Sequence, residues 1–486
     1  MPYGRIAGEL DEGRTTILGT AADQLAEVVQ RARVAQRTLE TYTQEQIDEL
    51  VRAAAWAGYS LASELARLAV EETGIGNYED KVRKTRRKTL GTLRDLMGSR
   101  SVGVISQDIE RGITEIAKPV GVVGAFTPLT NPGATVVNNI MIALKGGNAI
   151  ILAPHPKGDR TCRAAVRGVH AELTKVGAPV DIVQQFTLVT PEKTASKQRA
   201  RELMQKVDLV LVTAGPANVK AAYSSGTPAL GVGVGNVPVI VDATADIEDA
   251  AGKIARSKTF DNATSCSSEN SILVEDGIYD RVLSALAAEG GCVLSPAEKL
   301  LLQAFMWKDG RLSRSVVGQP SSLIAQLSGI TRPEAVRARF LMVEEEGIGA
   351  SYPFSDEKLS PVLTVYRFRG FEEAIDKVNR ILEVQGRGHS CGIHTKDQEH
   401  VAKLAQAVKV ARVLVNQAHC IGNGGDFTNG LNFTLSMGAG TWGGNSTCDN
   451  ITYKHLLNIT RISRVISADH PTEEELWGEY WRRYGK

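Results

Sequence analysis

The sequence predicts an α/β fold built on a doubly wound parallel sheet, and three observations carry this prediction. Between residues 120 and 212, short apolar runs alternate with stretches of helical pattern. A second alternation of this kind starts near residue 236. Residues 21–99, which precede both, contain no proline and repeat apolar residues at helical spacing. Strands that alternate with helices form βαβ units, so a ligand is expected at the carboxyl ends of parallel strands.

A helical segment and a hairpin come first along the chain. Residues 21–99 are rich in Ala, Leu, Glu, Gln and Arg, which have high helix propensity. Their basic run, residues 81–88, is interpreted as a solvated helix face. Residues 101–117 alternate apolar and polar side chains with a break at 110–112. That pattern predicts a β-hairpin that projects from the main body.

The two α/β regions account for most of the remaining chain. In the first region, apolar runs predict strands at 120–126, 149–152, 182–183 and 209–212, with helices over 160–175 and 194–206. In the second region they predict strands at 237–241, 272–274, 362–366 and 413–415. Gly- and Asn-rich loops occupy 421–447, and the tail is expected to hold a strand within 453–466 and a short helix over 472–483.

Composition and charge narrow the class of protein. Lys and Arg total 56 against 55 for Asp and Glu in 486 residues, so no net charge favours nucleic acid or a membrane surface. Residues 1–5 begin no apolar signal segment, and no stretch reaches the roughly 18 apolar residues that span a bilayer. The six cysteines are scattered without a CxxC pair, which suits a reducing cytosol rather than a zinc site or disulfides. We expect a soluble cytoplasmic enzyme without a metal.

Cys266 is the candidate nucleophile. It lies among small polar residues in the run 260–270, just ahead of the apolar segment 271–274. A cysteine at the entrance to a strand in such a setting is typical of a reactive thiol, because partial deprotonation already makes it a strong nucleophile. The alternative is a half-buried structural cysteine.

The loop 127–133 after the first strand is the candidate cofactor loop. It lacks the G-x-G-x-x-G fingerprint of dinucleotide-binding loops. Asn131 and Pro132 lead into the next helix. Asn131 is therefore either the N-cap of that helix or a side-chain amide that stabilises a developing oxyanion.

Six segments together resemble the aldehyde dehydrogenase superfamily over nearly the whole chain. They are residues 127–132, 147–151, 153–156, 260–269, 357–361 and 443–446. The last two segments and the pair His155-Pro156 resemble the CoA-acylating branch in particular. The resemblance implies an aldehyde dehydrogenase-like fold with two Rossmann-like α/β domains and a small β oligomerisation element. Its parts would be a cofactor-binding domain over 1–235 (with the hairpin 101–117 in the oligomerisation element), a catalytic domain over 236–430, and a return to the cofactor domain with an oligomerisation tail over 431–486.

The resemblance also implies roles for individual residues. Cys266 would be the nucleophile that becomes a thioester, and Asn131 with the backbone N–H of Cys266 would form the oxyanion hole. Glu357 would hold the nicotinamide ribose of NAD or NADP. The implied cofactor-binding residues are Thr127, Pro128, His155, Pro156, Lys157, Ala214, Gly215, Val232, Gly233, Glu357 and Leu359. Ala263 departs from the family, in which Gly is usual three residues before the nucleophile.

One residue of the hydrolytic members is missing. They carry a water-activating Glu in a Glu-x-Gly-Gly-x-x-Pro segment, and alignment on Pro238 puts Val232 at its position. No Asp or Glu occurs between residues 209 and 241. Water then lacks a general base, whereas the thiolate of coenzyme A needs none. The sequence therefore predicts reversible oxidation of an aldehyde to its acyl-CoA; the alternatives are a hydrolytic enzyme that uses a distant carboxylate and a non-catalytic relative that only binds a nucleotide.

The substrate and the assembly stay open at this point. The branch includes enzymes for acetaldehyde, propionaldehyde, succinate semialdehyde and sulfoacetaldehyde. Arg256 and Lys258, near Cys266 in the sequence, are the residues that would favour a short anionic aldehyde. Lys157 and Arg160 would accept the 2′-phosphate of NADP. We expect a homodimer or a dimer of dimers joined through the hairpin and the tail strand, in the cytoplasm or a bacterial microcompartment.

Overall fold

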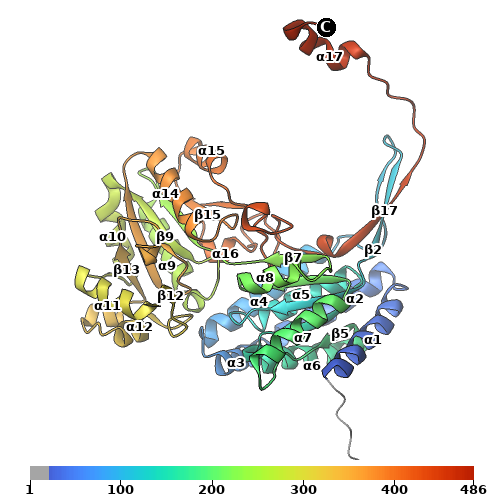
Figure 1. The fold of residues 1–486 in the computed structure, drawn as a ribbon, viewed down its shortest axis with the longest axis horizontal. Helices are drawn as coiled ribbons and strands as arrows, with labels where there is room; N and C mark the ends of the chain where they lie inside the picture. Colours follow the sequence, from blue (N-terminus) through green and yellow to red (C-terminus); the bar gives the residue numbers. More distant parts are fainter. Residues whose placement is uncertain (1–20) are drawn as a thin grey trace, which may run out of the picture.

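The computed structural model describes residues 21–486 and confirms the α/β fold (Figure 1). Two parallel sheets, of five and seven strands, form two adjacent bodies, and a three-stranded antiparallel sheet extends from one of them. The prediction made from residues 1–5 lies outside the described residues. The division at residues 235 and 430 stays a prediction, although the five-stranded sheet ends at Val232 and the seven-stranded sheet begins at Val237.

Four helices precede the first sheet. They are α1 (Ala21–Leu39), α2 (Gln44–Ser60), α3 (Ala62–Thr73) and α4 (Tyr78–Leu96). Thr43 forms a capping box with Gln46 at the start of α2, and Asn77 caps α4 by accepting the N–H of Asp80. α4 packs against α2, α3 and α5. The interpretation of the basic run on α4 as a solvated face is wrong for Lys81 and Lys84, which are 5% and 7% exposed.

The five-stranded sheet is doubly wound, with strand order β5-β4-β3-β6-β7 and every neighbouring pair parallel. Alternate residues of β3 face opposite helix layers: Val123 and Ala125 pack with α2, α5 and α6, whereas Val122 and Phe126 pack with α1, α7 and α8. The strands are β3 (Val122–Thr127), β4 (Ala149–Pro154), β5 (Val183–Gln185), β6 (Leu209–Thr213) and β7 (Ala229–Val232). The helices are α5 (Ala134–Lys145), α6 (Asp159–Lys175), α7 (Lys193–Lys206) and α8 (Pro216–Tyr223).

The seven-stranded sheet has the order β10-β13-β14-β9-β8-β15-β16 and is parallel throughout. Its strands are β8 (Val237–Val241), β9 (Glu269–Glu275), β10 (Gly291–Val293), β13 (Phe340–Glu344), β14 (Val362–Phe368), β15 (Cys391–His394) and β16 (Val413–Val415). The helices of this body are α9 (Ile247–Thr259), α10 (Tyr279–Ala288), α11 (Pro296–Met306), α12 (Ser321–Leu327), α13 (Pro333–Arg337), α14 (Phe371–Val384), α15 (Gln398–Ala407) and α16 (His419–Gly422). A two-stranded hairpin, β11 (Trp307–Lys308) and β12 (Arg311–Leu312), completes it.

The predicted hairpin and tail strand meet in the third sheet. β1 (Gly103–Asp108) and β17 (Leu457–Ser463) each pair antiparallel with β2 (Ile113–Pro119), which lies between them. The chain then leaves the body, and α17 (Glu473–Tyr484) ends far from both large sheets (Figure 1). Within residues 21–486, no helix is long and apolar enough to cross a membrane.

Candidate active site

A cleft of about 450 Å³ lies at the carboxyl ends of the strands of the five-stranded sheet. Thr127 and Thr213, the last residues of β3 and β6, line it together with Cys266 from the second body. Most residues singled out in the sequence meet here: Asn131, Thr127, Pro128, His155, Pro156, Ala214, Gly215, Gly233, Cys266, Glu357 and Leu359 all line the cleft. The rule that ligands bind at the carboxyl edge of a doubly wound sheet therefore places the cleft correctly.

Two predicted cofactor residues do not line this cleft. The Lys157 side chain is exposed, and its backbone N–H donates to Nδ1 of His155 over 3.1 Å. Val232 is 2% exposed and packs in the core between the sheet and helices α2, α5 and α6. Its neighbours Gly233 and Val234 line the cleft instead. The backbone of this segment thus borders the cleft, but the Val232 side chain faces the core.

Cys266 lies between a turn that follows α9 and the start of β9. It is partly exposed, and its surroundings raise the pKa of the thiol to about 12, first through burial and second through the Glu357 carboxylate. Arg412 and the Ser267 hydroxyl act in the opposite direction. The thiol is therefore protonated at neutral pH in the ligand-free chain, and a cationic neighbour or a proton acceptor must favour the reactive thiolate.

The turn ahead of Cys266 is strained. Asp261, Asn262 and Ala263 have φ angles of 51°, 52° and 56°, which is the left-handed region that favours glycine. Each such residue costs about 1–2 kcal/mol relative to a right-handed conformation, so the surroundings must hold the turn. Ala263, where Gly is usual in the family, is fully buried and adopts the positive φ itself. Ala263 therefore keeps the left-handed backbone conformation although it replaces the usual Gly.

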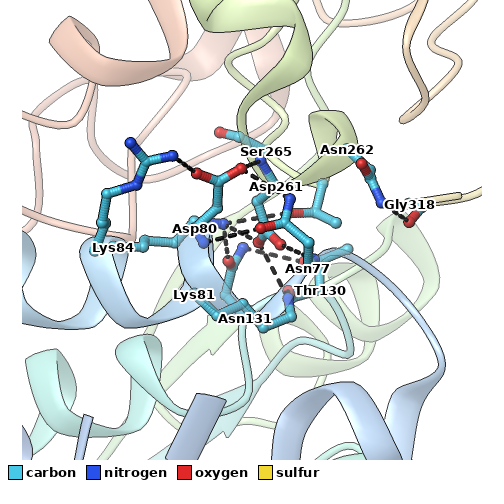
Figure 2. A network of polar contacts seen from close by, with 12 residues as sticks. Asn77, Asp80, Lys81, Lys84, Thr130, Asn131, Asp261, Asn262, Ser265 and Gly318 are labelled. Atoms are coloured by element: carbon cyan, nitrogen blue, oxygen red, sulfur yellow. Dashed lines mark hydrogen bonds and ion pairs between the residues drawn. The ribbon is translucent and has the colours of Figure 1, made fainter. Parts of the chain in front are cut away.

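Buried polar contacts hold this turn (Figure 2). The Asp261 carboxylate is fully buried and accepts hydrogen bonds from the Asn77 backbone N–H, from Lys81 and from Lys84. Its backbone N–H donates to Asp80, also on α4, over 2.8 Å. The two ammonium groups lower the pKa of Asp261 against the opposing effect of burial. The helix that carries the basic run thereby fixes the loop of the candidate nucleophile.

Asn131 does not cap the following helix. The N-cap of α5 is Gly133, and no side chain caps it, so the N-cap interpretation of Asn131 is wrong. Oδ1 of Asn131 instead accepts a hydrogen bond from Nζ of Lys84 over 2.7 Å (Figure 2). The other amide atom, Nδ2, contacts Thr130 Oγ1 at 3.4 Å. Asn131 and Cys266 thus line the same cleft, and the Oδ1 atom of Asn131 is bound by Lys84.

Glu357 is the one carboxylate among the residues lining the cleft. Oε1 accepts the Gly235 backbone N–H over 3.2 Å, and Oε2 accepts Gln385 Nε2 over 3.3 Å. Burial raises its pKa to about 8, and the Asp356 charge adds to that effect. A carboxyl group with this pKa is a candidate hydrogen-bond partner for sugar hydroxyls, and it is also a candidate base.

A second cavity, of about 620 Å³, meets the first at Asn131 and next to Cys266. Both cavities are lined by Asn131, Ser265, Leu435 and Met437. Seven cations line the second cavity, namely Arg83, Lys84, Arg86, Arg87, Lys88, Arg256 and Arg339, against the single acid Asp80. Arg83, Lys84 and Arg87 are paired with Asp80, Asp261 and Asp426. Arg86, Lys88 and Arg256 have no carboxylate partner within residues 21–486, so the cavity has an excess of positive charge.

The pair His419 and Cys420 does not form an acid–base dyad. His419 is buried, and its two ring nitrogens contact the carbonyl oxygens of Ser267 and Cys391 at 2.9 and 3.2 Å. Burial lowers the pKa of His419 to about 4, so it stays neutral. Its backbone N–H donates to Glu269 over 2.9 Å. The residue holds strands together rather than serving the cleft.

Sequence reasoning missed several polar residues of the two cavities. Lys193, Ser196 and Lys197 of α7 line the first cavity. Lys84 and Asp261 join Asn131 to the loop of Cys266. Lys258, by contrast, is 1% exposed and does not line either cavity, whereas Arg256 lines the second. The sequence held no signal that singles out Lys84 within the basic run of residues 81–88.

The chain matches the model of the "Aldehyde dehydrogenase family" over residues 12–290 and 351–430. It is 53% identical to the acylating sulfoacetaldehyde dehydrogenase of Cupriavidus necator, over 96% of this chain and 94% of the relative. It superimposes with a TM-score of 0.88 on an acetylating aldehyde dehydrogenase from Geobacillus thermoglucosidasius, at 37% identity, covering 93% of this chain and 98% of that one. A propionaldehyde dehydrogenase from Rhodopseudomonas palustris, solved with bound CoA and an acylated cysteine, gives 0.78 at 26% identity, covering 90% and 97%. The chain belongs to the aldehyde dehydrogenase family and to its acylating branch.

Proposed function

We propose that this enzyme oxidises a short anionic aldehyde to its acyl-CoA with NAD⁺ or NADP⁺, reversibly, through a thioester on Cys266. The observation that carries the proposal is the place of Cys266 and Asn131 where two cavities meet. One cavity lies at the strand ends that bind nucleotides in doubly wound folds. The other has an excess of cations. An anionic aldehyde can enter from one side while the nucleotide and CoA enter from the other.

The first cavity fits a nicotinamide nucleotide. Oγ1 of Thr127 and Oγ1 of Thr135 are buried without a hydrogen-bond partner in the described chain, and both residues line the cavity. Glu357 supplies a carboxyl group for hydrogen bonds with ribose hydroxyls. Lys193 and Lys197 supply positive charge for phosphate groups. When bound, NAD(P)⁺ accepts the hydride that leaves the aldehyde carbon.

The protein's own residues carry the first half of the reaction. The Cys266 thiolate adds to the aldehyde carbon and forms a C–S bond, which leaves the electron pair of the carbonyl on oxygen. The Asn131 amide and the backbone N–H of Cys266 donate hydrogen bonds to that oxyanion, and one such donor contributes roughly 3 kcal/mol to catalysis. As the carbonyl re-forms, the carbon loses hydride and the acyl group stays on Cys266 as a thioester.

The acyl acceptor follows from the missing base. No Asp or Glu occurs between residues 209 and 241, and Glu357 is the one acid that lines the cleft of Cys266. The thiol of CoA gives its proton to solvent, and its thiolate attacks the thioester, which transfers the acyl group and releases Cys266 as thiolate. Water needs a general base to attack the thioester, and Glu357 is the acid that could serve as this base in the hydrolytic alternative.

The excess positive charge of the second cavity supports an anionic substrate. Arg86 and Arg256 are available to an anion because they have no carboxylate partner within residues 21–486. Lys88 also lacks a carboxylate partner there, but its ammonium group donates to the carbonyl oxygens of Gly424 and Gly425. Burial lowers the pKa of Lys88 to about 7, so a bound anion would favour its charged form. A sulfonate or carboxylate group would be held by such cations. Because the Cupriavidus relative is named for sulfoacetaldehyde, this aldehyde is the first candidate.

The test compares three aldehydes with and without CoA and with each nucleotide. Sulfoacetaldehyde, succinate semialdehyde and acetaldehyde are mixed with enzyme while the absorbance of NAD(P)H is followed. Without CoA, we expect a burst of one NAD(P)H per active site and then no turnover; with CoA, we expect steady turnover and acyl-CoA by mass spectrometry. Steady turnover at the full rate without CoA would establish hydrolysis instead. The Cys266→Ser variant is the control and should lose both burst and turnover.

Assembly and location belong to the same proposal. β17 is an edge strand of the projecting sheet, so its free edge is available to a second copy of the chain. We propose a homodimer or a dimer of dimers on this basis. All six cysteines are unpaired, which agrees with a cytoplasmic location, with a bacterial microcompartment as the alternative.

A further inference from the structure

We infer that Lys84 is the positioning residue of the oxyanion hole: its ammonium group orients the Asn131 amide and ties it to the loop of Cys266. The inference rests on the proposed roles of Asn131 and Cys266. Asn131 follows β3 of the five-stranded sheet, whereas Cys266 precedes β9 of the seven-stranded sheet. The two donors of the oxyanion hole therefore come from different bodies, and something must hold them in register.

Lys84 contacts both sides of this junction (Figure 2). Its Nζ donates to Asn131 Oδ1 over 2.7 Å, to Asp261 Oδ2 over 2.5 Å and to Thr264 Oγ1 over 3.2 Å. An ammonium group has three hydrogens, so these contacts use its full donor capacity. Lys84 is 7% exposed, so water competes little for these bonds.

The contact with Lys84 determines which atom of Asn131 is free. An ammonium group donates and cannot accept, so the amide atom that it contacts must be the oxygen. Nδ2 is then directed away from Lys84, and it donates to the neighbouring Thr130 hydroxyl at 3.4 Å. Without Lys84, rotation of the amide would present an oxygen to the developing oxyanion. A carbonyl oxygen at that place would repel the negative charge.

Lys84 acts on the nucleophile side through the strained turn. Asp261 and Thr264 belong to the segment that leads to Cys266, and Thr264 Oγ1 donates to Asp261 Oδ2 over 2.8 Å. Thr264 lies two residues before Cys266 and lines the same cleft. One ammonium group thus contacts the side-chain donor of the oxyanion hole and the turn whose end provides the backbone donor.

Lys81 provides a matched control on the same helix. It also donates to Asp261 Oδ2, over 3.1 Å, and is 5% exposed. Its second contact is the backbone carbonyl of Thr130 at 3.4 Å, not the Asn131 amide. Replacing either lysine by Met leaves Asp261 with one ammonium partner. Both variants remove one ammonium contact to Asp261, but only Lys84→Met also removes the contacts to the Asn131 amide and to Thr264 Oγ1.

The experiment measures the NAD(P)H burst in a single turnover without CoA, which isolates acylation of Cys266. Lys84→Met should slow the burst about tenfold or more, since loss of one oriented oxyanion donor costs on the order of a hundredfold. The burst rate of Lys81→Met should stay within about threefold of the wild-type rate, because this variant leaves the contact between Lys84 and Asn131 in place. The KM for the aldehyde should change little in either variant, because the ground state has no oxyanion. Thermal unfolding should show similar losses of stability for both.

Two results would overturn the inference. Equal slowing of the burst by Lys84→Met and Lys81→Met would reduce Lys84 to a structural ion pair. Slowing by Lys84→Met that is undiminished in an Asn131→Ala background would show that Lys84 does not act through Asn131. If Asn131→Ala alone leaves the burst unchanged, the proposed oxyanion hole fails first, whatever Lys84 does. Should the Met variants not fold, Lys84→Gln and Lys81→Gln fill the space and permit the same comparison.

Discussion

Cys266, the proposed nucleophile, has a thiol that is protonated at rest. Its pKa of about 12 comes first from burial and second from Glu357, and Glu357 itself has a pKa raised to about 8. The two groups lie in one cleft, and the ionised Glu357 carboxylate disfavours the Cys266 thiolate. The resting enzyme is thereby protected from indiscriminate reaction, and the thiolate forms when ligands change the charge of the cleft.

This arrangement predicts how the free enzyme reacts with iodoacetamide. Only the thiolate is alkylated, so the rate at Cys266 should keep rising between roughly pH 7 and 9 without a plateau, because the pKa of Cys266 lies above this range. The rise should be less than about tenfold per pH unit, because Glu357 ionises near pH 8 and raises the pKa of Cys266 further. Glu357→Gln should raise the rate at fixed pH, because it removes the second cause of the raised pKa. Mass spectrometry of the Cys266 peptide measures the rate, with Cys448→Ser as background because Cys448 is exposed. A plateau below pH 9 would contradict the prediction.

Arg256 should determine specificity for the charged group of the aldehyde. It lines the second cavity without a carboxylate partner in the described chain. Arg256→Met should raise the KM for sulfoacetaldehyde about tenfold, as loss of a charge-assisted hydrogen bond predicts, and leave the KM for acetaldehyde unchanged. Arg281→Met, on α10 and exposed, is the control and should change neither value. Equal changes for both aldehydes would contradict a role in recognising the anion.

The residues that could be predicted from the sequence are those with a local pattern. Cys266, Asn131 and Glu357 lie in short motifs whose chemistry is readable in place, and all three line the cleft. Lys84 could not be assigned, because its partner Asp261 is 177 positions away in the sequence. Val232 was predicted to bind the cofactor from its aligned position in the sequence. The alternation of side chains along β7 instead directs its side chain into the core.

At the scale of elements, α4 departs most from its predicted role. Its charged sequence resembles a solvated helix, yet it packs against three helices and lines the second cavity with one face. Charge alone does not separate a solvated face from one that pairs with buried carboxylates of another body. The strands β8 and β16 were predicted with their observed bounds, whereas β10, which begins at Gly291 and is as short as β16, was not predicted.

Helix α7 should provide the phosphate contacts of the first cavity. Lys193 and Lys197 line it and are exposed at the start of the helix. The double variant Lys193→Met/Lys197→Met should raise the KM for the nucleotide and for CoA about fivefold, the scale of exposed charge pairs. Added salt should raise these KM values less in the variant than in the wild type, because screening acts on the same contacts. The control Arg201→Met/Lys206→Met removes the same amount of charge elsewhere on α7 and should leave both KM values unchanged. If the two double variants raise the KM values equally, the effect comes from net charge and not from contacts of Lys193 and Lys197.

At the scale of the whole molecule, the cleft lies where the two α/β bodies meet. The carboxyl ends of β3, β4 and β6 border it, and the loop before β9 enters it from the other body. The sequence predicted both alternations of strands and helices, because each is a local rhythm of apolar residues. It did not predict that Lys84 of α4 contacts both Asn131 and the turn before Cys266, because those contacts depend on how the two bodies pack.

The tail of the chain, beyond β17, exposes apolar side chains that do not pack against the rest of residues 21–486. Beyond β17, the apolar side chains of Val465, Leu476, Trp477 and Tyr480 are exposed by 101%, 61%, 53% and 57%, and α17 lies away from the body (Figure 1). Exposed apolar groups next to a free strand edge favour association with another copy. Light scattering should therefore give about twice the chain mass of 52.2 kDa, or four times for a dimer of dimers.

Deletion of residues 464–486 should weaken that association and spare the chemistry. The truncated chain should dissociate at protein concentrations where the full chain is oligomeric, because the exposed apolar groups of α17 are gone. Its NAD(P)H burst per chain should equal that of the full chain, since no residue of α17 lines the cleft of Cys266 and α17 lies away from both large sheets (Figure 1). Light scattering and the burst are measured on the same samples. A full-length chain that is monomeric, or a truncated chain with an unchanged oligomer, would contradict the role assigned to the tail.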